Sequence, residues 1–140
     1  MFKLDSHLQN DTVRLGSFAL SDVLLMNDAR YPWVILVPRR EDVTEVYELA
    51  NTEQQQLWQE SSFVAEKLSA FVNADKMNVA AIGNVVSQLH IHHVARFRSD
   101  EVWPAPVWGR GTAIPYSPIE LEKWSNDLKQ LFAEQWQDGK

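Results

Sequence analysis

The sequence predicts an α+β fold in which a mostly antiparallel sheet packs with a long central helix and a C-terminal helix. Two observations predict it: short apolar segments typical of strands come in adjacent runs, and stretches with the apolar spacing of helices separate these runs. The chain has 140 residues, of which 45% are hydrophobic and 23% charged, as in an ordinary folded domain. We therefore expect a single domain over residues 1–140.

Three strands are predicted in the first part of the chain. Residues 13–20 and 23–26 are rich in apolar side chains, and residues 33–37 are continuously apolar and rich in β-branched residues. The segment 27–32 has turn-forming residues and ends in a proline, and a basic loop follows the third strand at residues 38–40. The third segment is therefore predicted to be a buried strand.

The middle of the chain changes to helical spacing. Thr52 and Gln55 have the spacing of a capping box at a helix start. One stripe of a long amphipathic helix follows at intervals of three and four residues: Leu57, Ser61, Val64, Leu68 and Phe71. Residues 78–82 and 89–96 then have the chemistry of two further strands.

The chain is predicted to close with a second amphipathic helix, over about residues 117–137. Ser117 is a capping residue, Pro118 suits the first helical position, and Glu120 completes the capping pattern. Residues with helical spacing follow them: Leu121, Trp124, Leu128, Leu131 and Gln135.

The charge and composition limit the function classes. A formal charge of −6 and a pI near 5.1 argue against a polynucleotide partner, which normally needs a basic surface, but leave a small anionic ligand open. The absence of cysteine excludes disulfide and thiolate chemistry and fits a reducing compartment. With no basic–apolar leader and no apolar run of about 20 residues, we expect a cytoplasmic protein without a membrane partner.

The segment with the most chemical information contains three of the four histidines, at residues 90–93. Side chains alternate across a strand, so Gln88, His90 and His92 are predicted to share one face and His93 the other. One imidazole can attack an electrophilic phosphorus while its other nitrogen is held by a fixed acceptor, and a second can donate to a phosphoryl oxygen. Backbone amides around Gly83 could add to such a phosphate site, since glycine permits a close approach.

Two other interpretations of the pair stay open. His90 and His92 could be ordinary strand histidines with satisfied hydrogen bonds, or a metal chelate. A metal would need a third ligand, Gln88 is a poor ligand for zinc, and the next acid is Asp100, so no metal site is predicted. His93 is predicted to be structural, and no function is predicted for His7.

Two features downstream of the histidines are also candidates. Arg96 closes the histidine strand, and its guanidinium matches phosphate oxygens, although a plain surface role is an alternative. The segment 103–109 holds two tryptophans among prolines, so it could cap the ligand cleft or a partner, or pack in the core.

The histidine segment resembles the histidine triad (HIT) superfamily, whose motif is His-x-His-x-His followed by two apolar residues. Here the motif appears as Gln88-Leu89-His90-Ile91-His92-His93-Val94, with Gln88 in place of the first histidine. The resemblance covers roughly the first hundred residues, including the order of strands and helix before the motif. It implies that His90 is the nucleophile of a covalent nucleotidyl-histidine intermediate and that His92 binds the phosphoryl group. Gln88 keeps hydrogen-bonding capacity but cannot be protonated.

The same resemblance implies a fold, substrates and partners. The fold would be a HIT-like one with a five-stranded sheet, and Asn27 and Asp28 would lie near the ribose of a bound nucleotide. The family often has Gly-Gln-Ser or Gly-Gln-Thr before the triad, where this chain has Gly83-Asn84-Val85. Substrates would be nucleotide phosphoanhydrides or phosphoramidates, such as dinucleoside polyphosphates, cleaved by a hydrolase or nucleotidyl transferase. A homodimer and no tightly bound cofactor are expected, and a divalent cation accompanying the substrate is left open.

One alternative function follows from the departures from the motif. With Gln88 and Val85 in place of a histidine and a hydroxyl residue, the chain could be a nucleotide-binding or sensing module whose catalysis is weakened. A metal-dependent enzyme built on His90 and His92 is a further alternative. The predicted site residues are thus His90, His92 and Gln88 for catalysis, and Asn27, Asp28, Gly83, Asn84 and Arg96 for nucleotide binding.

Overall fold

The computed structural model describes residues 1–137 and contains one five-stranded sheet. The strand order is β1-β2-β3-β5-β4, and every neighbouring pair is antiparallel. The strands have these bounds: β1 Thr12–Ser17, β2 Ser21–Met26, β3 Trp33–Pro38, β4 Lys76–Ala80 and β5 Ile91–Arg96. The predicted α+β fold with an antiparallel sheet is confirmed.

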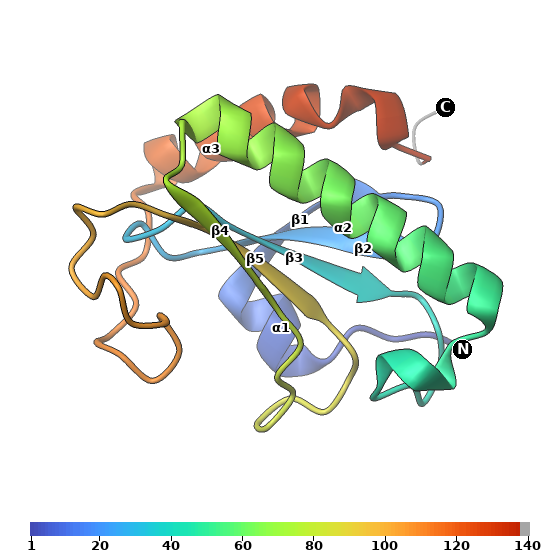
Figure 1. Ribbon diagram of the computed structural model, residues 1–140. Coiled ribbons are helices and arrows are strands. Elements are labelled where there is room, and N and C mark those ends of the chain that lie inside the picture. The colour runs from blue at the N-terminus through green and yellow to red at the C-terminus, as the bar shows by residue number, and fades with distance from the viewer. Residues whose placement is uncertain (138–140) are drawn as a thin grey trace.

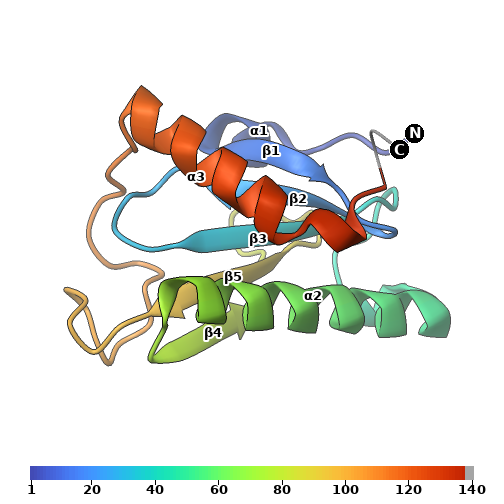
Figure 2. The same ribbon diagram turned by 90° about the horizontal axis from the view of Figure 1, so that it is seen from above.

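Helices cover the two faces of this sheet unequally (Figures 1 and 2). The long helix α2 (Asn51–Val72) and the C-terminal helix α3 (Pro118–Leu131) lie on one face, and the short helix α1 (Ser6–Asp11) lies on the other. Two 3-10 turns, η1 (Val46–Glu48) and η2 (Ala133–Gln135), complete the elements. The α1 face is therefore partly left to loops, and it is the face that carries the candidate site.

The main core lies between the sheet and the two longer helices. The α2 stripe contributes Leu57, Ser61, Val64 and Leu68, all buried as predicted, whereas Phe71 is 46% exposed. Strand β3 is buried on both faces because Val34 and Leu36 face α2 while Ile35 and Val37 pack in the cluster on the α1 face. This explains why its sequence is continuously apolar rather than alternating.

Several element boundaries differ from the prediction. Helix α2 begins at Asn51, and the Ala50 amide donates to Glu53 Oε1 at 2.9 Å, so the predicted capping box of Thr52 and Gln55 is wrong. Helix α3 does begin after Ser117, whose hydroxyl oxygen accepts from the Glu120 amide, but it ends at Leu131 and η2 follows. Helix α1 was not predicted at all.

The alternation along β5 divides the histidines between the two faces. His93 faces α2, while His92 and the preceding His90 face α1. No helix in residues 1–137 is both long and apolar enough to cross a membrane.

Candidate functional site

His93 is a structural residue, as predicted. Its side chain is fully buried; Nδ1 lies 3.1 Å from the Val34 carbonyl oxygen and Nε2 lies 2.7 Å from Ser61 Oγ. The carbonyl can only accept, so Nδ1 carries the hydrogen and Nε2 accepts from the hydroxyl. Burial lowers the pKa of His93 to about 4, so the ring is neutral at pH 7 and ties β5 to β3 and α2.

His90 has one nitrogen fixed by the backbone and the other available. Its Nδ1 lies 2.7 Å from the carbonyl oxygen of Gln88, which can only accept a hydrogen bond. Nδ1 therefore carries the hydrogen, and in the neutral ring Nε2 is left with its lone pair. The residue is 6% exposed, so the Nε2 lone pair sits in a recessed position.

His92 has the opposite tautomer. The indole nitrogen Nε1 of Trp33 donates to His92 Nδ1 at 3.0 Å, and an indole nitrogen can only donate. In the neutral ring the hydrogen is therefore on Nε2. Burial, assisted by the neighbouring His90 and His93, lowers the pKa of His92 to about 3, so at pH 7 the ring is a neutral hydrogen-bond donor.

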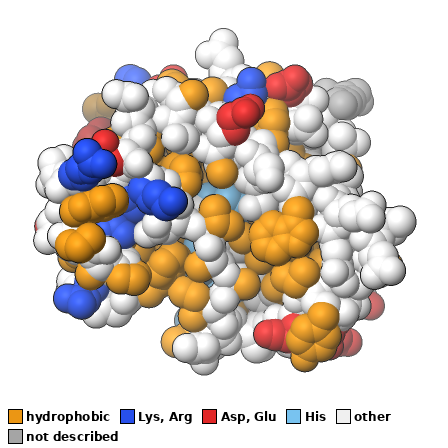
Figure 3. Space-filling view, in the orientation of Figure 1, with side chains coloured by type: hydrophobic (Ala, Val, Ile, Leu, Met, Phe, Trp, Pro, Cys, Tyr) orange, Lys and Arg blue, Asp and Glu red, His pale blue; other side chains and the backbone are white. Residues whose placement is uncertain are grey.

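The two rings lie close together on a cavity. Their centroids are 4.8 Å apart with an angle of 72° between the planes. The cavity has a volume of about 450 Å³ and both imidazoles line it. Figure 3 shows a small area of histidine surface near the centre of the view, bordered by hydrophobic side chains. The two adjacent rings thus present a nitrogen lone pair and an N–H donor to the same cavity. This arrangement suits an electrophile that carries negatively charged oxygens.

The segment before the histidines forms another wall of this cavity. Gly83 and Asn84, both predicted site residues, line it together with their neighbours Ile82, Val85 and Val86. Gly83 has φ of +72°, in the left-handed region that favours glycine. The predicted turn at Gly83 is therefore brought to the two imidazoles.

Gln88 does not line this cavity. Its Oε1 accepts from the Asp5 amide at 2.8 Å and its Nε2 donates to the Lys3 carbonyl oxygen at 2.8 Å. Residue 88 precedes β5, so strand alternation does not place its side chain beside His90. The predicted support of the imidazole by Gln88 comes from its main-chain carbonyl rather than its side-chain amide.

Asn27 and Asp28 hold loops in the described structure. Asn27 Oδ1 accepts from the Tyr116 amide at 2.9 Å, and Asp28 forms an ion pair with Arg30 at 2.8 Å. Asp28 is buried, which raises the pKa of its carboxyl, but hydrogen bonds and charge from Arg30 and an amide from Ile114 lower it overall. Neither residue lines the histidine cavity, although the adjacent Met26 does.

The Arg96 side chain also makes its contacts outside the histidine cavity. Its guanidinium forms two hydrogen bonds with the Asp100 carboxylate, at 2.8 and 3.0 Å, and a third with Asn78 Oδ1 at 2.8 Å. The side chain is 1% exposed and its guanidinium lies over the rings of Tyr31 and Trp103. The guanidinium predicted to bind phosphate therefore anchors the loop that follows β5.

That loop returns to the site through Trp108. Trp108 and Gly109 line the cavity, and the indole ring meets His92 edge to face with centroids 5.4 Å apart. Trp108 Nε1 is buried and has no hydrogen-bond partner among residues 1–137, so this part of the chain leaves one unused donor at the site. Of the alternatives predicted for residues 103–109, a position at the ligand cleft fits Trp108 and Gly109, and packing in the core fits Val107, which is buried.

Sequence reasoning also missed site residues on β3 and α1. Trp33, predicted only as part of a strand, sets the tautomer of His92. His7, Leu8 and Asp11 of α1 line the cavity, although no function was predicted for His7 and no helix was predicted there. In the region 1–137 no group of three or more His, Cys, Asp or Glu side chains could hold a metal ion.

Comparison with known proteins finds similar domains and structures. The HIT domain family model matches residues 7–99. A histidine triad protein from Marinobacter aquaeolei is 47% identical with a TM-score of 0.94, the match covering 96% of this chain and 98% of that one. A histidine triad protein from Sinorhizobium meliloti is 41% identical with a TM-score of 0.88, covering 96% and 97%.

A more distant structure shares the fold alone. Diadenosine triphosphate hydrolase from Plasmodium falciparum is 15% identical with a TM-score of 0.66, the match covering 98% of this chain and 84% of that one. The search of curated proteins found no match. The family model spans well over half of the chain and its match contains both cavity histidines: the protein belongs to the histidine triad family.

Proposed function

We propose that the protein is a nucleotide hydrolase or nucleotidyl transferase that works through a covalent nucleotidyl-histidine intermediate on His90. The observation that carries this proposal is the fixed tautomer of His90, whose Nδ1 is bound to the Gln88 carbonyl oxygen at 2.7 Å. Its Nε2 lone pair is thereby available on a cavity large enough for a nucleotide.

The first step forms one bond and breaks another. The Nε2 lone pair of His90 attacks the nucleotidyl phosphorus and forms a P–N bond. The bond from phosphorus to the leaving group breaks, and its electron pair departs with that group. The ring then carries a positive charge, which the Gln88 carbonyl oxygen stabilises through the retained Nδ1 hydrogen.

The second step restores the histidine. The oxygen of water, or of another acceptor, attacks phosphorus, and the P–N electron pair returns to His90 Nε2. The proton of the attacking hydroxyl goes to solvent. A nucleoside monophosphate, or its ester with the acceptor, is released.

His92 supports both steps as a neutral donor. Its Nε2–H would bind a non-bridging phosphoryl oxygen, where negative charge increases in the transition state. Amides around Gly83 and Asn84, on the same cavity, are candidates for the other phosphoryl oxygens. A donor fixed by Trp33 needs no reorganisation as the charge develops.

The substrate class follows from the leaving group. His92 is the only described triad position besides the nucleophile that meets the cavity, because the Gln88 side chain binds the N-terminal segment. A phosphate leaves without being protonated, whereas an amine must gain a proton. We therefore propose dinucleoside polyphosphates as better substrates than phosphoramidates. The diadenosine triphosphate hydrolase with the same fold is compatible with this choice, although its likeness concerns the fold alone.

Intact-protein mass spectrometry tests the intermediate. Wild type and His90→Ala are incubated briefly with a diadenosine polyphosphate, quenched and weighed, while product is followed by chromatography. We expect a nucleotide-sized adduct and turnover in wild type and neither in His90→Ala, with nucleotide binding retained. Asn10→Ala, an exposed change outside the cavity, is the matched control for handling and folding. Turnover by His90→Ala would refute the proposal.

A nucleotide-binding or sensing module is the second candidate. The observation that favours it is the position of Gln88, which leaves two imidazoles rather than three titratable groups of the triad. Wild type that binds nucleotide tightly but gives neither adduct nor product would establish it.

A homodimer and the absence of a tightly bound cofactor belong to the same proposal. Strand β4 lies at one end of the strand order and pairs with β5 alone among the described strands. Val79 on it is 42% exposed and Phe71 of α2 is 46% exposed, so apolar surface accompanies this edge. Light scattering after size exclusion tests the dimer. Activity in the presence and absence of a chelator tests whether a divalent ion must accompany the substrate.

A further inference from the structure

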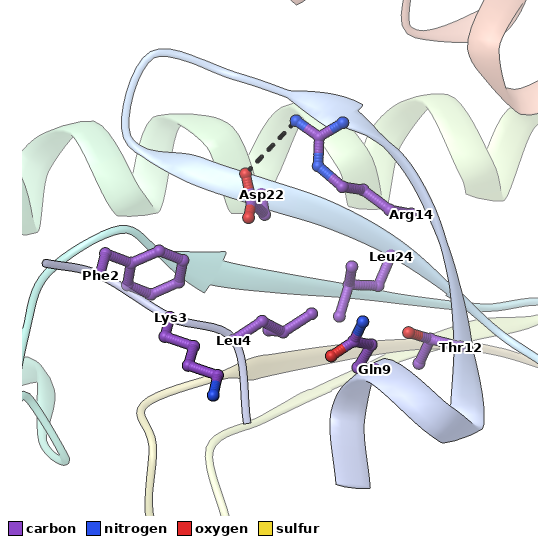
Figure 4. Close-up of a pocket in the computed structure, with 8 residues that line it drawn as sticks. All are labelled: Phe2, Lys3, Leu4, Gln9, Thr12, Arg14, Asp22 and Leu24. Atoms are coloured by element: carbon purple, nitrogen blue, oxygen red, sulfur yellow. Dashed lines mark ion pairs between the residues drawn. The ribbon is translucent and has the colours of Figure 1, made fainter. Parts of the chain in front are cut away.

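The side-chain amide of Gln88 connects the N-terminal segment to the residues that precede β5, through both its oxygen and its nitrogen. Gln88 Oε1 accepts from the Asp5 amide and Gln88 Nε2 donates to the Lys3 carbonyl oxygen, each at 2.8 Å. Phe2 and Leu4, on either side of Lys3, pack against the buried cluster on the α1 face of the sheet. Figure 4 shows this segment beside α1 and β2, around a second cavity of about 390 Å³ that contains no histidine.

The tie at Asp5 fixes the start of helix α1. Asp5 is the capping residue, and its Oδ1 accepts from the His7 amide at 2.8 Å. The same oxygen lies 3.3 Å from His7 Nδ1 on the side chain. Gln88 therefore holds the main chain of Asp5, and the Asp5 carboxylate faces both the His7 amide and Nδ1 of the His7 ring. With Nδ1–H directed at Asp5, Nε2 donates to a phosphate in the protonated ring, the form in which this contact is an ion pair.

Helix α1 then presents one face to the histidine cavity. His7, Leu8 and Asp11 line it, with Leu8 buried at 4% exposure and His7 on the outer rim with 69% of its side chain exposed. A substrate that reaches from His90 to the cavity mouth would pass this rim.

The charges at the cavity show what His7 can contribute. The described lining includes no lysine or arginine, and it includes one carboxylate, Asp11. Arg96, which is buried, and Arg30, whose side chain is 10% exposed, are paired with Asp100 and Asp28. The other titratable side chains on this lining or beside His7 are Asp5, Asp11, His90 and His92. Beyond the two strand imidazoles and the indole nitrogen of Trp108, a polyphosphate in this cavity would gain from a positively charged side chain near the mouth.

We propose that His7 is a ligand-contacting residue that binds the phosphates of the leaving group, and that Gln88 is a positioning residue that sets His7 at the cavity. This inference rests on the proposed function. In this proposal the residue at the first triad position, Gln88, does not contact the substrate. Its side chain positions the N-terminal segment, which carries His7. His7, from a different element, supplies a third imidazole to the cavity.

Two substrates of the same nucleotide separate this role from a general effect on the site. A diadenosine polyphosphate loses a group with several phosphates, whereas adenosine 5′-phosphoramidate loses only an amine. We expect His7→Leu to slow adduct formation from the polyphosphate by about ten- to a hundredfold, the range for loss of a hydrogen bond to a charged group, and to leave the phosphoramidate rate within about twofold. His7→Arg should restore most of the polyphosphate rate, and Asn10→Ala is the control on the same helix.

Gln88→Ala tests the positioning role of the Gln88 side chain. It should reproduce the selective loss on the polyphosphate, because it releases Lys3 and Asp5 without touching the cavity. Limited proteolysis should also show faster cleavage in residues 1–11. Equal slowing of both substrates by His7→Leu, or an unchanged polyphosphate rate in either variant, would overturn the inference.

A binding measurement keeps the inference separate from the proposed catalysis. If wild type forms no adduct with either substrate, the proposed function fails. Calorimetry then compares ADP with AMP: His7→Leu should remove the preference for the diphosphate if His7 binds phosphates. An unchanged preference would refute the role of His7 by itself.

Discussion

Acid sensitivity of folding should depend on His93. The ring is fully buried between α2 and β3, and burial lowers its pKa to about 4, although backbone hydrogen bonds with Val34 and Ile91 act in the opposite direction. In the unfolded chain a histidine has a pKa of about 6.5. Between these values the unfolded state binds more protons than the folded state. The contribution to stability is therefore complete above about pH 6.5 and is lost progressively as the pH falls toward 4.

The size of the effect follows from the two pKa values. Lowering the pH from 7 to 5 should cost about 2 kcal/mol of unfolding free energy for His93. His92, whose pKa burial lowers to about 3, should add a similar loss of about 2 kcal/mol. Asp28 and Asp100 have lowered pKa values and stay ionised over this interval, so they add little. Wild type should then lose about 4 kcal/mol and His93→Gln, which cannot titrate, about 2 kcal/mol.

Urea unfolding at pH 7, 6 and 5 measures this difference. The decisive quantity is the slope of the unfolding free energy with pH, so any constant loss of packing in His93→Gln does not enter. Ser61→Ala is the matched control: it removes the hydroxyl at His93 Nε2 and lowers stability at every pH, but it leaves the ring buried and should keep the wild-type slope. If His93→Gln lost as much free energy as wild type between pH 7 and 5, the assignment of a buried neutral ring would be refuted.

Three further perturbations follow from the site. Trp33→Phe removes the donor to His92 Nδ1, so the His92 ring can place its hydrogen on either nitrogen. We expect adduct formation, measured by rapid quench, to slow by about tenfold. Circular dichroism should show that the fold is intact. Trp108→Phe removes an indole donor that has no partner in the described part of the chain, so stability should stay within about 0.5 kcal/mol. Calorimetry should show weaker nucleotide binding, and unchanged binding would exclude a ligand contact. Asp100→Asn leaves the buried Arg96 charge without its carboxylate; it should cost about 3 kcal/mol in chemical denaturation, and a neutral result would show that the ion pair is not structural.

The parts that the sequence predicted are those determined by short-range periodicity. Strand β3 is apolar throughout because both its faces are covered, and the stripe of α2 is buried from Leu57 to Leu68 because its spacing follows the helix. Alternation also placed His93 on the face opposite His92. These features depend on neighbouring residues only, so a pattern can reveal them.

The parts that escaped prediction depend on contacts between distant residues. Helix α1 has six residues and no apolar stripe; it is bounded by Asp5, which is held by an amide 83 residues away in sequence. Arg96 looked like a candidate phosphate ligand because nothing local reveals that Asp100 and Asn78 take its donors. The extension of alternation back to Gln88 failed because the strand begins only at Ile91.

The register between β3 and β5 explains how two similar histidines obtain different chemistry. Trp33 pairs with Val94, and His92 lies two residues before Val94 on the same face, within reach of a large side chain across the strands. A side-chain donor thus reaches His92 Nδ1, whereas His90, before the strand begins, turns its Nδ1 to the carbonyl two residues earlier. The first arrangement leaves a hydrogen on Nε2 and the second leaves a lone pair. A one-residue slip of β5 would turn His92 toward α2 and away from His90. The ladder that builds the sheet therefore also decides which ring presents a lone pair and which presents an N–H donor.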